Sequence, residues 1–501
     1  MPIKSIYKDV LYPYQKEAAS RIAKQKRVLL ADQPGLGKTL EVLAALEIGG
    51  MFEGRRNILI LTPVINAQTT WKSSIQRWIL PLYPEVNLID VSAGNSLQKA
   101  KQFEHASALN IVLANHNAID MTKGSMRVEK IRNLSYEALI VDESHLVLPI
   151  RDARQLTQFR QGLHAIPMSK SCWRVAISGT PDRGKLENRF GTWHFLEPIK
   201  FGTQRDWLAE NFHIFDQRVS RTKSIKVVGP LKSEDNWLAK DRELMIRRTK
   251  HEVLPQLPQK RYVDVELDLS KEQKLEYFAQ QMVSERKMAE STKIDGPSGE
   301  AMIFALRARQ IATCQWDREK NQPIVGGAST KFEWLKEWLD ERGFFSADEF
   351  ADESAKVVIV SQFSKVLGWL KQELGKLGLY AEILDGEVNA KRRGSIQHDF
   401  QHGELRVVLL SGNMGVGIDL DSADDLILLD LPYDPDRVEQ IEDRVHRASN
   451  MHQVTIWTLI GRDTIDMAIM EKVSSRYQIT RAMMDGSRGI NFSRQIVKLI
   501  K

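Results

Sequence analysis

Ten short apolar runs, in two groups of five, constrain the fold of this sequence more than any other feature. Each run is rich in Val, Ile and Leu, ends in polar or small residues and is followed by sequence with helical spacing of apolar residues. Such runs are typical of parallel strands that helices cover on both faces. We therefore predict an α/β protein with two doubly wound parallel-sheet lobes. The runs are KRVLLAD, NILILTP, NIVLAN, ALIVDES and WRVAISG, then KVVIVSQ, YAEILDG, RVVLLSG, DLILLDL and VTIWTLI.

The two groups of runs set the expected domain boundaries. We expect the first lobe over residues 1–185 and the second over residues 329–475. Between them, residues 186–328 carry apolar positions at helical spacing and few strand-like runs, which predicts a helical insertion and interlobe linker. Residues 476–501 are expected to form a helical extension at the C-terminus.

Composition and charge exclude several classes of protein. Hydrophobic residues make up 42% and charged residues 27%, a balance typical of soluble folded chains. The start lacks the pattern of a secretory signal, and no stretch approaches the roughly 20 apolar residues that cross a bilayer, so we expect a cytoplasmic protein without a membrane partner. Cys172 and Cys314 lie far apart and predict neither a disulfide framework nor a zinc site. The net charge of +6 is compatible with a polyanionic partner but weak support for one.

The first apolar run leads into a glycine-rich loop and then directly into helix-forming sequence. Glycines let backbone N–H groups turn toward phosphates, and the helix N-terminus adds positive potential. Lys38 is expected to reach the outer phosphates, and Thr39 to offer its hydroxyl to Mg²⁺. We therefore predict that this loop binds ATP. Its expected binding residues are Asp32, Gly35, Leu36, Gly37, Lys38 and Thr39.

The run ALIVDES places Asp142 and Glu143 at the carboxyl end of a strand, where sheets of this kind bind ligands. We expect Asp142 to hold Mg²⁺, directly or through water. Glu143 is then placed to polarise the water that attacks the outer phosphoryl group. Together with Lys38, these two carboxylates predict ATP hydrolysis rather than ATP binding alone.

These residues and several further segments resemble the Swi/Snf family of helicase superfamily two, and the match covers nearly the whole chain. The resemblance implies two RecA-like lobes and nominates Gln15, in LYPYQKEAA, as the adenine contact. The segment MIRRTKHEVLPQLPQKR is similar to the stretch that links the lobes in this family and that ordinary unwinding helicases lack. The other similar segments are ADQPGLGKT, LTPVINAQTTWKSSIQRW, IVDESH, ISGTP, VVIVSQF, ILDGEVNAKRRGSIQHDF, LLSGNMGVGIDL and QIEDRVHRAS.

The resemblance also implies that Arg444 and Arg447 are arginine fingers, which reach the outer phosphate bound on the first lobe. Their spacing of three residues is consistent with one helix face. A planar, permanently charged guanidinium suits the negative charge of a phosphoryl-transfer transition state. One position departs from the family pattern, because Asp419 stands where Asn is commoner. His145 and His446, inside motifs, are expected to form interlobe hydrogen bonds and not to bind metal.

Polar residues at the ends of predicted strands are the expected DNA contacts. Motors of this architecture grip phosphates with N–H groups, hydroxyls and helix N-termini, which gives binding that ignores base identity. The partner we expect is therefore double-stranded DNA of any sequence, with a DNA-bound protein as a further candidate. The expected contacts are Thr62, Asn66, Ser361, Gln362 and Ser411.

The sequence thus predicts a DNA-stimulated ATPase that translocates on double-stranded DNA and remodels DNA or protein–DNA complexes without obligatory strand separation. A strand-separating helicase is the first alternative, but it needs a wedge, and the stretch from Gly417 to Gln440 leaves little room for one. A non-catalytic DNA-binding scaffold is the second alternative. The five candidate catalytic residues argue against it: Lys38, Asp142, Glu143, Arg444 and Arg447.

Overall fold

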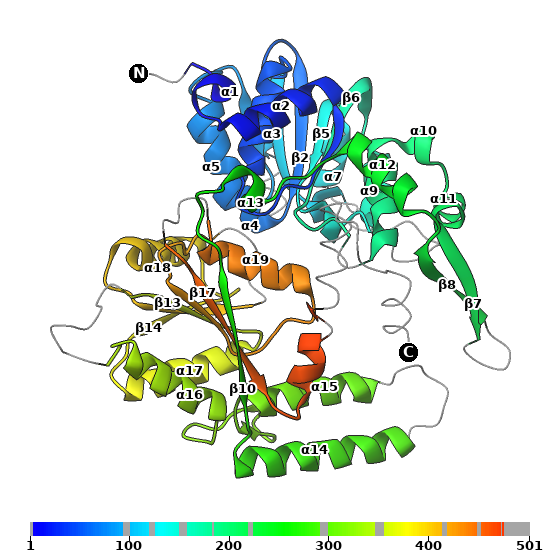
Figure 1. The fold of residues 1–501 in the computed structure, drawn as a ribbon. Coiled ribbons are helices and arrows are strands. Elements are labelled where there is room, and N and C mark those ends of the chain that lie inside the picture. Colours follow the sequence, from blue (N-terminus) through cyan, green and yellow to red (C-terminus); the bar gives the residue numbers. More distant parts are fainter. Residues whose placement is uncertain are drawn as a thin grey trace. The chain divides into compact units, whose positions relative to one another are not determined.

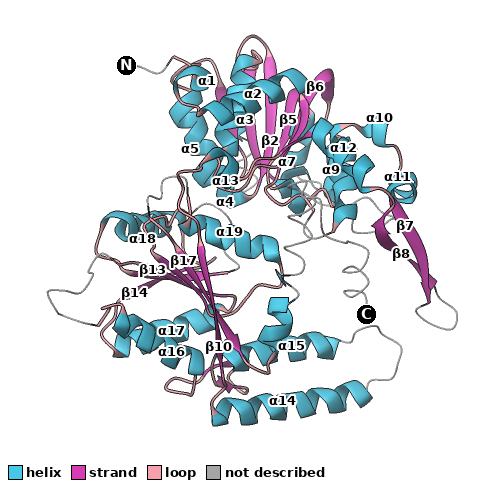
Figure 2. Ribbon diagram, viewed as in Figure 1, coloured by secondary structure: helices cyan, strands magenta, loops and turns pink. Residues whose placement is uncertain are grey.

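The computed structural model describes residues 4–93, 101–119, 126–149, 158–182, 185–218, 224–290, 299–345, 355–412, 418–447, 452–471 and 473–474. The chain divides into two compact units, the first running to Leu254 and the second beginning at Pro255. Each unit has its own parallel sheet (Figure 1), and Figure 2 shows the strands of each sheet in magenta among cyan helices.

Seven strands form the sheet of the first unit, in the order β3-β4-β2-β5-β6-β1-β9. All neighbouring pairs are parallel. The five runs predicted for this lobe are confirmed as β1, β2, β4, β5 and β6. The bounds are β1 Arg27–Leu30, β2 Arg56–Thr62, β3 Asn87–Asp90, β4 Leu109–Asn115, β5 Tyr136–Val141, β6 Met168–Ile177 and β9 Met245–Ile246.

Alternate residues of each strand point to opposite faces, so this sheet separates two apolar cores. Ile58 and Ile60 of β2 pack with α2 and α3, whereas Leu59 and Leu61 pack with α8 and α9. Both faces are buried, which explains why the runs read as continuously apolar. The helices are α1 Ile6–Asp9, α2 Pro13–Gln25, α3 Lys38–Ile48, α4 Val64–Asn66, α5 Lys72–Ser74, α7 Met126–Arg132, α8 Gln158–His164, α9 Arg189–Leu196, α10 Pro198–Phe201, α11 Gln204–Asn211, α12 Glu234–Leu244 and α13 Lys250–Val253; π-helical turns at Ala67–Trp71 and Ile75–Ile79 flank α5.

Six parallel strands form the sheet of the second unit, in the order β10-β17-β16-β13-β15-β14. The five runs predicted for this lobe are confirmed as β13 to β17. Val357 and Ile359 pack with α16 and α17 on one face, and Val358 and Val360 pack with α18 and α19 on the other. The bounds are β10 Arg261–Leu267, α14 Lys271–Glu290, α15 Gly299–Thr313, β11 Trp316–Asp317, β12 Gln322–Pro323, α16 Thr330–Glu341, β13 Val357–Ser361, α17 Ser364–Lys376, β14 Ala381–Leu384, α18 Ala390–His402, β15 Val407–Ser411, β16 Asp425–Leu428, α19 Pro435–Val445 and β17 Thr455–Gly461.

The stretch expected as a separate helical insertion, residues 186–328, is divided between the two units and holds more strands than expected. Within it, β7 Phe212–Arg218 and β8 Ser224–Leu231 form an antiparallel hairpin. Strand β9 joins the first sheet beside β1, and β10 joins the second beside β17. In β10, Val263, Val265 and Leu267 are apolar at every second position, which is typical of a strand. This short pattern was missed because most of residues 186–328 have apolar residues at helical spacing. The expected helical extension at 476–501 lies outside the described residues.

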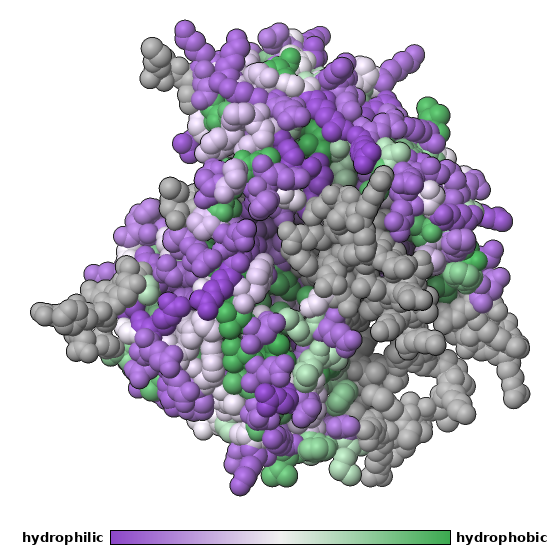
Figure 3. Space-filling model, in the orientation of Figure 1, coloured by the Kyte–Doolittle hydropathy of each residue, from purple (hydrophilic) through white to green (hydrophobic). Residues whose placement is uncertain are grey.

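Hydrophilic residues cover most of the face drawn in Figure 3. The largest exposed apolar side chains include Leu275, Phe278 and Met282, which lie at helical spacing along α14. Among the helices that the structure describes, none combines the length and apolar character that a bilayer crossing requires.

Candidate active site

The glycine-rich loop joins the end of β1 to the start of α3 at Lys38, so its backbone N–H groups lie at a helix N-terminus. Gly35 and Gly37 have φ angles of +85° and +87°, in the left-handed region that residues with a side chain rarely adopt. A Cβ at position 37 would also lie 2.3 Å from Nε2 of Gln15. The loop therefore needs glycine at both positions, as a phosphate loop does.

Gln15 and Lys38 hold the loop in shape. Nε2 of Gln15 donates a hydrogen bond of 2.8 Å to the carbonyl oxygen of Leu36, and Oε1 accepts one of 3.0 Å from the backbone N–H of Tyr12. Nζ of Lys38 donates to the carbonyl oxygens of Asp32 at 2.7 Å and Gln33 at 3.2 Å. Gln15 thus supports the loop backbone, while its contact with adenine stays a prediction.

Asp142 follows β5 and is the hub of a buried hydrogen-bond network. Its Oδ2 accepts bonds from Thr62 Oγ1 at 2.7 Å, Trp71 Nε1 at 2.9 Å and Asn66 Nδ2 at 3.1 Å. Its Oδ1 accepts from the backbone N–H of Glu143 at 2.9 Å, which leaves that oxygen acceptor capacity for a metal-bound water. Such fixed orientation of a carboxylate by outer partners is typical of metal sites. Trp71 was not foreseen, because its spacing also fits an ordinary core residue.

Glu143 has a φ of +45°, which is unusual for a residue other than glycine. Its Oε2 lies 3.3 Å from Nδ1 of His145, which in turn lies 2.9 Å from Oγ of Ser178. Backbone strain of this kind concentrates at functional sites. The chain thus holds Glu143 in a turn that directs it away from the ordinary continuation of β5, with His145 and Ser178, from the segment ISGTP, beside it.

Replacing Trp71 by Phe should weaken metal-dependent ATP turnover by about 10-fold, because outer-shell partners of a metal ligand contribute on this scale. The substitution keeps an aromatic ring in the core but removes the indole donor from Asp142. The Mg²⁺ concentration for half-maximal ATPase activity should rise, while the thermal unfolding midpoint should change little. The matched control is Trp78→Phe, since Trp78 lies in the same helical segment and is not a donor to Asp142. An equal loss in both variants would mean that Trp71 acts through packing alone.

Arg248 is a site residue that sequence reasoning did not single out. Its guanidinium pairs with Asp32 in the loop, lies 2.8 Å from Oε1 of Glu41 in α3, and donates to the backbone carbonyl of Tyr14. Burial and the neighbouring carboxylate of Asp32 raise the pKa of Glu41 well above its usual range. Asp32 and Glu41 are both fully buried. One cation therefore lies between two buried acidic groups, and the raised pKa of Glu41 favours its uncharged form beside the ion pair of Arg248 and Asp32.

Of the two candidate arginine fingers in the second unit, Arg444 lies in the last turn of α19, whereas Arg447 lies two residues beyond the end of this helix at Val445. The two arginines therefore do not share one helix face, as their spacing had predicted. Arg444 is buried, and its backbone carbonyl accepts a hydrogen bond of 2.9 Å from Leu420. Arg447 pairs with Asp419, the residue that departs from the family pattern. The glycine-containing stretch before Asp419, residues 413–417, lies outside the described residues. Nε2 of His446 donates a bond of 2.7 Å to the carbonyl oxygen of Pro258. Both residues belong to the second unit, so this bond is not the interlobe contact that was expected.

Four of the five predicted DNA-contacting side chains are buried as the structure places them: Thr62, Asn66, Ser361 and Ser411. Thr62 and Asn66 donate to Asp142, and Ser361 donates to Asp430 at 2.6 Å. Buried polar side chains in folded proteins are normally hydrogen-bonded within the protein. In this structure these side chains face the interior of the protein, and their contact with DNA stays a prediction. Gln362 is half-buried, and its backbone N–H donates to Asp430 at 3.0 Å.

Among the residues that the structure describes, no group of three or more His, Cys, Asp and Glu side chains forms a metal cluster. Thr39, in the first turn of α3, and Asp142 remain the candidate ligands. Mg²⁺ in phosphate-binding enzymes commonly uses one or two protein groups together with waters and phosphate oxygens. This small donor set fits that pattern.

The fold and the site define a helicase-like nucleotide-binding protein with two parallel-sheet units. A family model described as the SNF2-related domain matches residues 14–317, and one described as the helicase conserved C-terminal domain matches residues 331–449. The chain belongs to the SNF2-related family.

Curated relatives align along nearly the whole chain. The chain is 24% identical to the CHD3-type chromatin-remodeling factor PICKLE of Arabidopsis thaliana, an alignment that covers 93% of this chain and 33% of the relative. It is 25% identical to the DNA annealing helicase and endonuclease ZRANB3 of Bos taurus, over 95% of this chain and 41% of the relative. The chain thus spans less than half the length of these two relatives. Among solved structures, the Sulfolobus solfataricus SWI2/SNF2 ATPase core in complex with dsDNA aligns with 19% sequence identity and a TM-score of 0.43. The alignment covers 99% of this chain and 98% of that chain.

Proposed function

We propose that the protein is an ATP-driven motor that translocates on double-stranded DNA and remodels DNA or protein–DNA complexes without obligatory strand separation. The observation that supports the proposal is that a chain of the SNF2-related family holds the residue types that ATP hydrolysis needs. The set combines a phosphate loop, the Asp142–Glu143 pair, Arg444 in the last turn of α19 and Arg447 just beyond it. The names of the relatives, which include chromatin remodelling and DNA annealing, support DNA as the substrate.

In the proposed mechanism the first unit binds and orients ATP. Backbone N–H groups of the loop and the ammonium of Lys38 bind the phosphates. Thr39 and Asp142 would hold Mg²⁺, which neutralises phosphate charge when it is bound. Glu143 orients the attacking water and accepts its proton, with the side chain kept in place by its left-handed backbone and by His145.

The second unit would supply the remaining positive charge. Arg444 and Arg447 stabilise the charge that develops on the transferred phosphoryl group, as planar guanidinium groups do in other phosphoryl-transfer enzymes. Binding of duplex DNA is proposed to align these arginines with the nucleotide, which makes ATP hydrolysis depend on DNA. Contacts to the DNA backbone make this dependence independent of sequence.

The two alternatives have less support. A strand-separating helicase needs a pin, and residues 418–440, all of which the structure describes, hold only β16 and the first part of α19. A non-catalytic scaffold would have no need for the strained Glu143 turn or for the network that orients Asp142. The translocating motor is the function that these groups serve best.

The protein should displace the third strand of a triplex DNA in an ATP-dependent reaction and should fail to separate a forked duplex. A third strand blocks the track without being part of it, so translocation alone removes it, whereas fork separation requires a pin in the path of the duplex. Release of a fluorescent third strand and of a labelled fork strand should be measured side by side at equal ATPase rates.

The controls for this experiment are a non-hydrolysable ATP analogue and the Lys38→Ala protein, neither of which should release the third strand. Efficient fork separation would replace the translocase proposal by the helicase alternative. Absence of DNA-stimulated ATPase activity, with folded protein and bound DNA, would favour the scaffold.

A further inference from the structure

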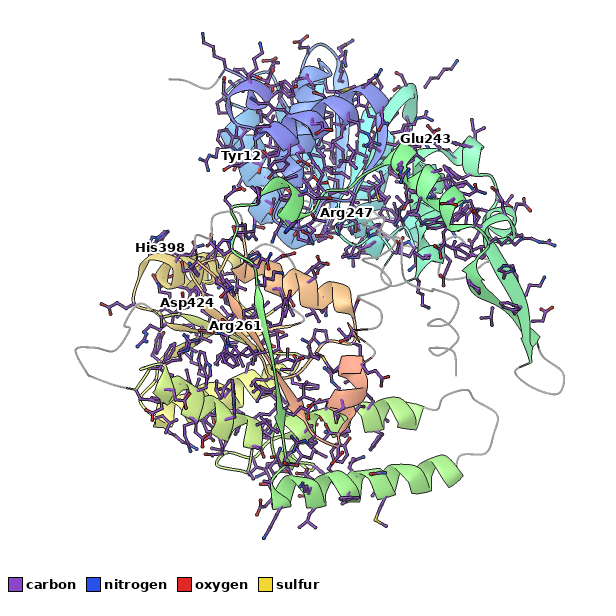
Figure 4. The ribbon with its side chains drawn as sticks, viewed as in Figure 1. Tyr12, Glu243, Arg247, Arg261, His398 and Asp424 are labelled. Atoms are coloured by element: carbon purple, nitrogen blue, oxygen red, sulfur yellow. The ribbon has the colours of Figure 1, made fainter. Side chains whose placement is uncertain are left out.

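The segment that joins the two units, residues 247–262, is anchored on both sides by buried charged groups. It leaves the first unit after Leu254 and enters the second at Pro255. In Figure 4 the labelled Arg247 and Arg261 mark its two ends. We call residues 247–262 the strap.

The first anchor ties the strap to the phosphate loop. Arg248 pairs with Asp32 of the loop and Glu41 of α3, and its guanidinium lies 5.1 Å from the centre of the Tyr14 ring. Gln33 of the loop forms two further hydrogen bonds with the backbone of the strap. The backbone N–H of Gln33 donates to the carbonyl oxygen of Arg248 at 3.1 Å, and the side-chain oxygen of Gln33 accepts from the backbone N–H of Lys250 at 2.6 Å. The loop therefore cannot change shape without moving the strap.

Further bonds extend this anchor to the neighbouring strand end. The Arg247 guanidinium donates to the carbonyl oxygens of Ala31 at 2.7 Å and Gly179 at 3.1 Å. Gly179 belongs to the segment ISGTP, beside the hydroxyl of Ser178 that contacts His145. The first anchor thus contacts residues next to both halves of the candidate active site in this unit.

The second anchor ties the strap to α19, which carries Arg444 and ends two residues before Arg447. Nζ of Lys260 lies 2.9 Å from Oε2 of Glu442 and 3.4 Å from Oδ1 of Asp443. Burial opposes the charge of Lys260, but these two carboxylates outweigh it and raise the pKa of Lys260 well above its usual range. Tyr262 OH donates to Glu442 at 2.9 Å, and the carbonyl of Pro258 contacts His446.

The strap is short between its two anchors at Arg248 and Lys260. Residues Lys250–Val253 form a helical turn, which Thr249 caps together with Glu252. Pro255 and Pro258 follow, and proline fixes the backbone angle φ near −65°. Because the connection is short and two of its residues have a fixed φ, the distance that the two anchors can move apart is limited.

We propose that the strap couples the occupancy of the phosphate loop to the position of α19, with Arg248 and Lys260 as positioning residues. This inference rests on the proposed ATPase function. In this structure the ammonium of Lys38 donates to the carbonyl oxygens of Asp32 and Gln33, the same two residues that hold the strap. Binding of phosphates redirects Lys38 toward the nucleotide, changes the loop at these residues and so moves Arg248.

The test lengthens the strap without altering either anchor. Four residues, Gly-Ser-Gly-Ser, are inserted between Pro255 and Gln256, which are both exposed. The same insertion after Gly54, in an exposed turn of the first unit, is the matched control. Long insertions in exposed segments change folding entropy only slightly, so both proteins should fold.

Hydrogen–deuterium exchange of α19 should be measured with and without saturating ADP, which occupies the loop but lacks the outer phosphate. ADP should change exchange of α19 in the parent and in the Gly54 insertion, and should leave it unchanged in the strap insertion. The loop itself should be protected by ADP in all three proteins. Equal changes in α19 in all three, or no change in the parent, would overturn the proposal. Because this readout needs neither DNA nor hydrolysis, its failure is distinct from failure of the motor function.

A second pair of variants tests the anchor in the second unit. Lys260→Met should lower kcat for DNA-stimulated ATP hydrolysis at least 10-fold with the KM for ATP within threefold, and Lys260→Arg should restore most of kcat. Loss that Lys260→Arg does not restore, or a rise in KM without a fall in kcat, would argue against a positioning role for this residue.

Discussion

Replacement of Lys38 by Ala should reduce ATP turnover by about 10²–10³-fold or more, the scale on which single preorganised charge donors contribute to enzymatic rates. The ammonium lies within the loop, held by two backbone carbonyls, so its removal leaves the fold of β1 and α3 in place. Duplex DNA affinity at fixed salt should stay within a few-fold. Turnover is measured by phosphate release at saturating DNA, and affinity by fluorescence anisotropy.

Two further variants, Lys24→Ala and Glu143→Gln, serve as comparisons for Lys38→Ala. Lys24→Ala, which removes an exposed lysine of α2, should have normal turnover. Glu143→Gln should hydrolyse ATP as poorly as Lys38→Ala but should still bind it, because the amide keeps the size of the side chain and leaves Asp142 intact. Near-normal turnover in Glu143→Gln would assign the activation of water to another group.

Replacement of Arg447 by Ala should lower DNA-stimulated turnover by about 10³–10⁵-fold, the contribution of arginine fingers in phosphoryl transfer. Nucleotide and DNA should still bind, because the phosphate loop belongs to the other unit. Single-turnover hydrolysis and nucleotide affinity should be measured together. Arg462→Ala is the control, since Arg462 lies in the same unit and its ion pairs with Glu266 and Asp268 are exposed. A loss smaller than 10-fold would remove Arg447 from the finger role.

Asp419, which pairs with Arg447 in this structure, provides a variant with a smaller expected effect on ATP turnover. Asp419 and Arg447 are partly exposed, with 46% and 29% of their side chains accessible, and such pairs contribute only about 0.2–1 kcal/mol. Asp419→Asn keeps an acceptor but removes the competing charge. Turnover without DNA should therefore rise by no more than a few-fold, and the ratio of stimulation by DNA should fall.

Much of this molecule could be predicted from its sequence because the strong signals are local. A continuous apolar run, a glycine-rich loop and a helix follow each other along the chain, so the ten runs and the phosphate loop are visible in a single pass. Strand β9 has only two residues and carries no periodicity. Only the fold brings it beside β1, and with it Arg248 beside Asp32.

The candidate DNA contacts show where local reasoning is insufficient. Thr62 and Ser361 stand at strand ends, where ligands bind in α/β sheets, but each also faces a buried carboxylate contributed by a strand distant in sequence. The hydrogen bonds to Asp142 and Asp430 decide the orientation of these hydroxyls. Neither partner could be assigned before the order of the strands was known. Trp71 was missed for the same reason, since its indole donor is recognisable only beside Asp142.

The position of β9 at the edge of the first sheet also fixes when this unit can mature during synthesis. Its strand neighbour β1 leaves the ribosome early. Strand β9 and Arg248 emerge only after the residues of α9 to α12, which precede them in the sequence, have been synthesised. Until then Asp32 and Glu41 lack their shared guanidinium, and burying the charged carboxylate of Asp32 without its cation is costly. The nascent protein should therefore acquire a stable nucleotide pocket late, at the point where the chain passes into its second unit. A ribosome stalled before residue 248 should carry a loop that binds nucleotide poorly, whereas one stalled a full exit-tunnel length after it should not.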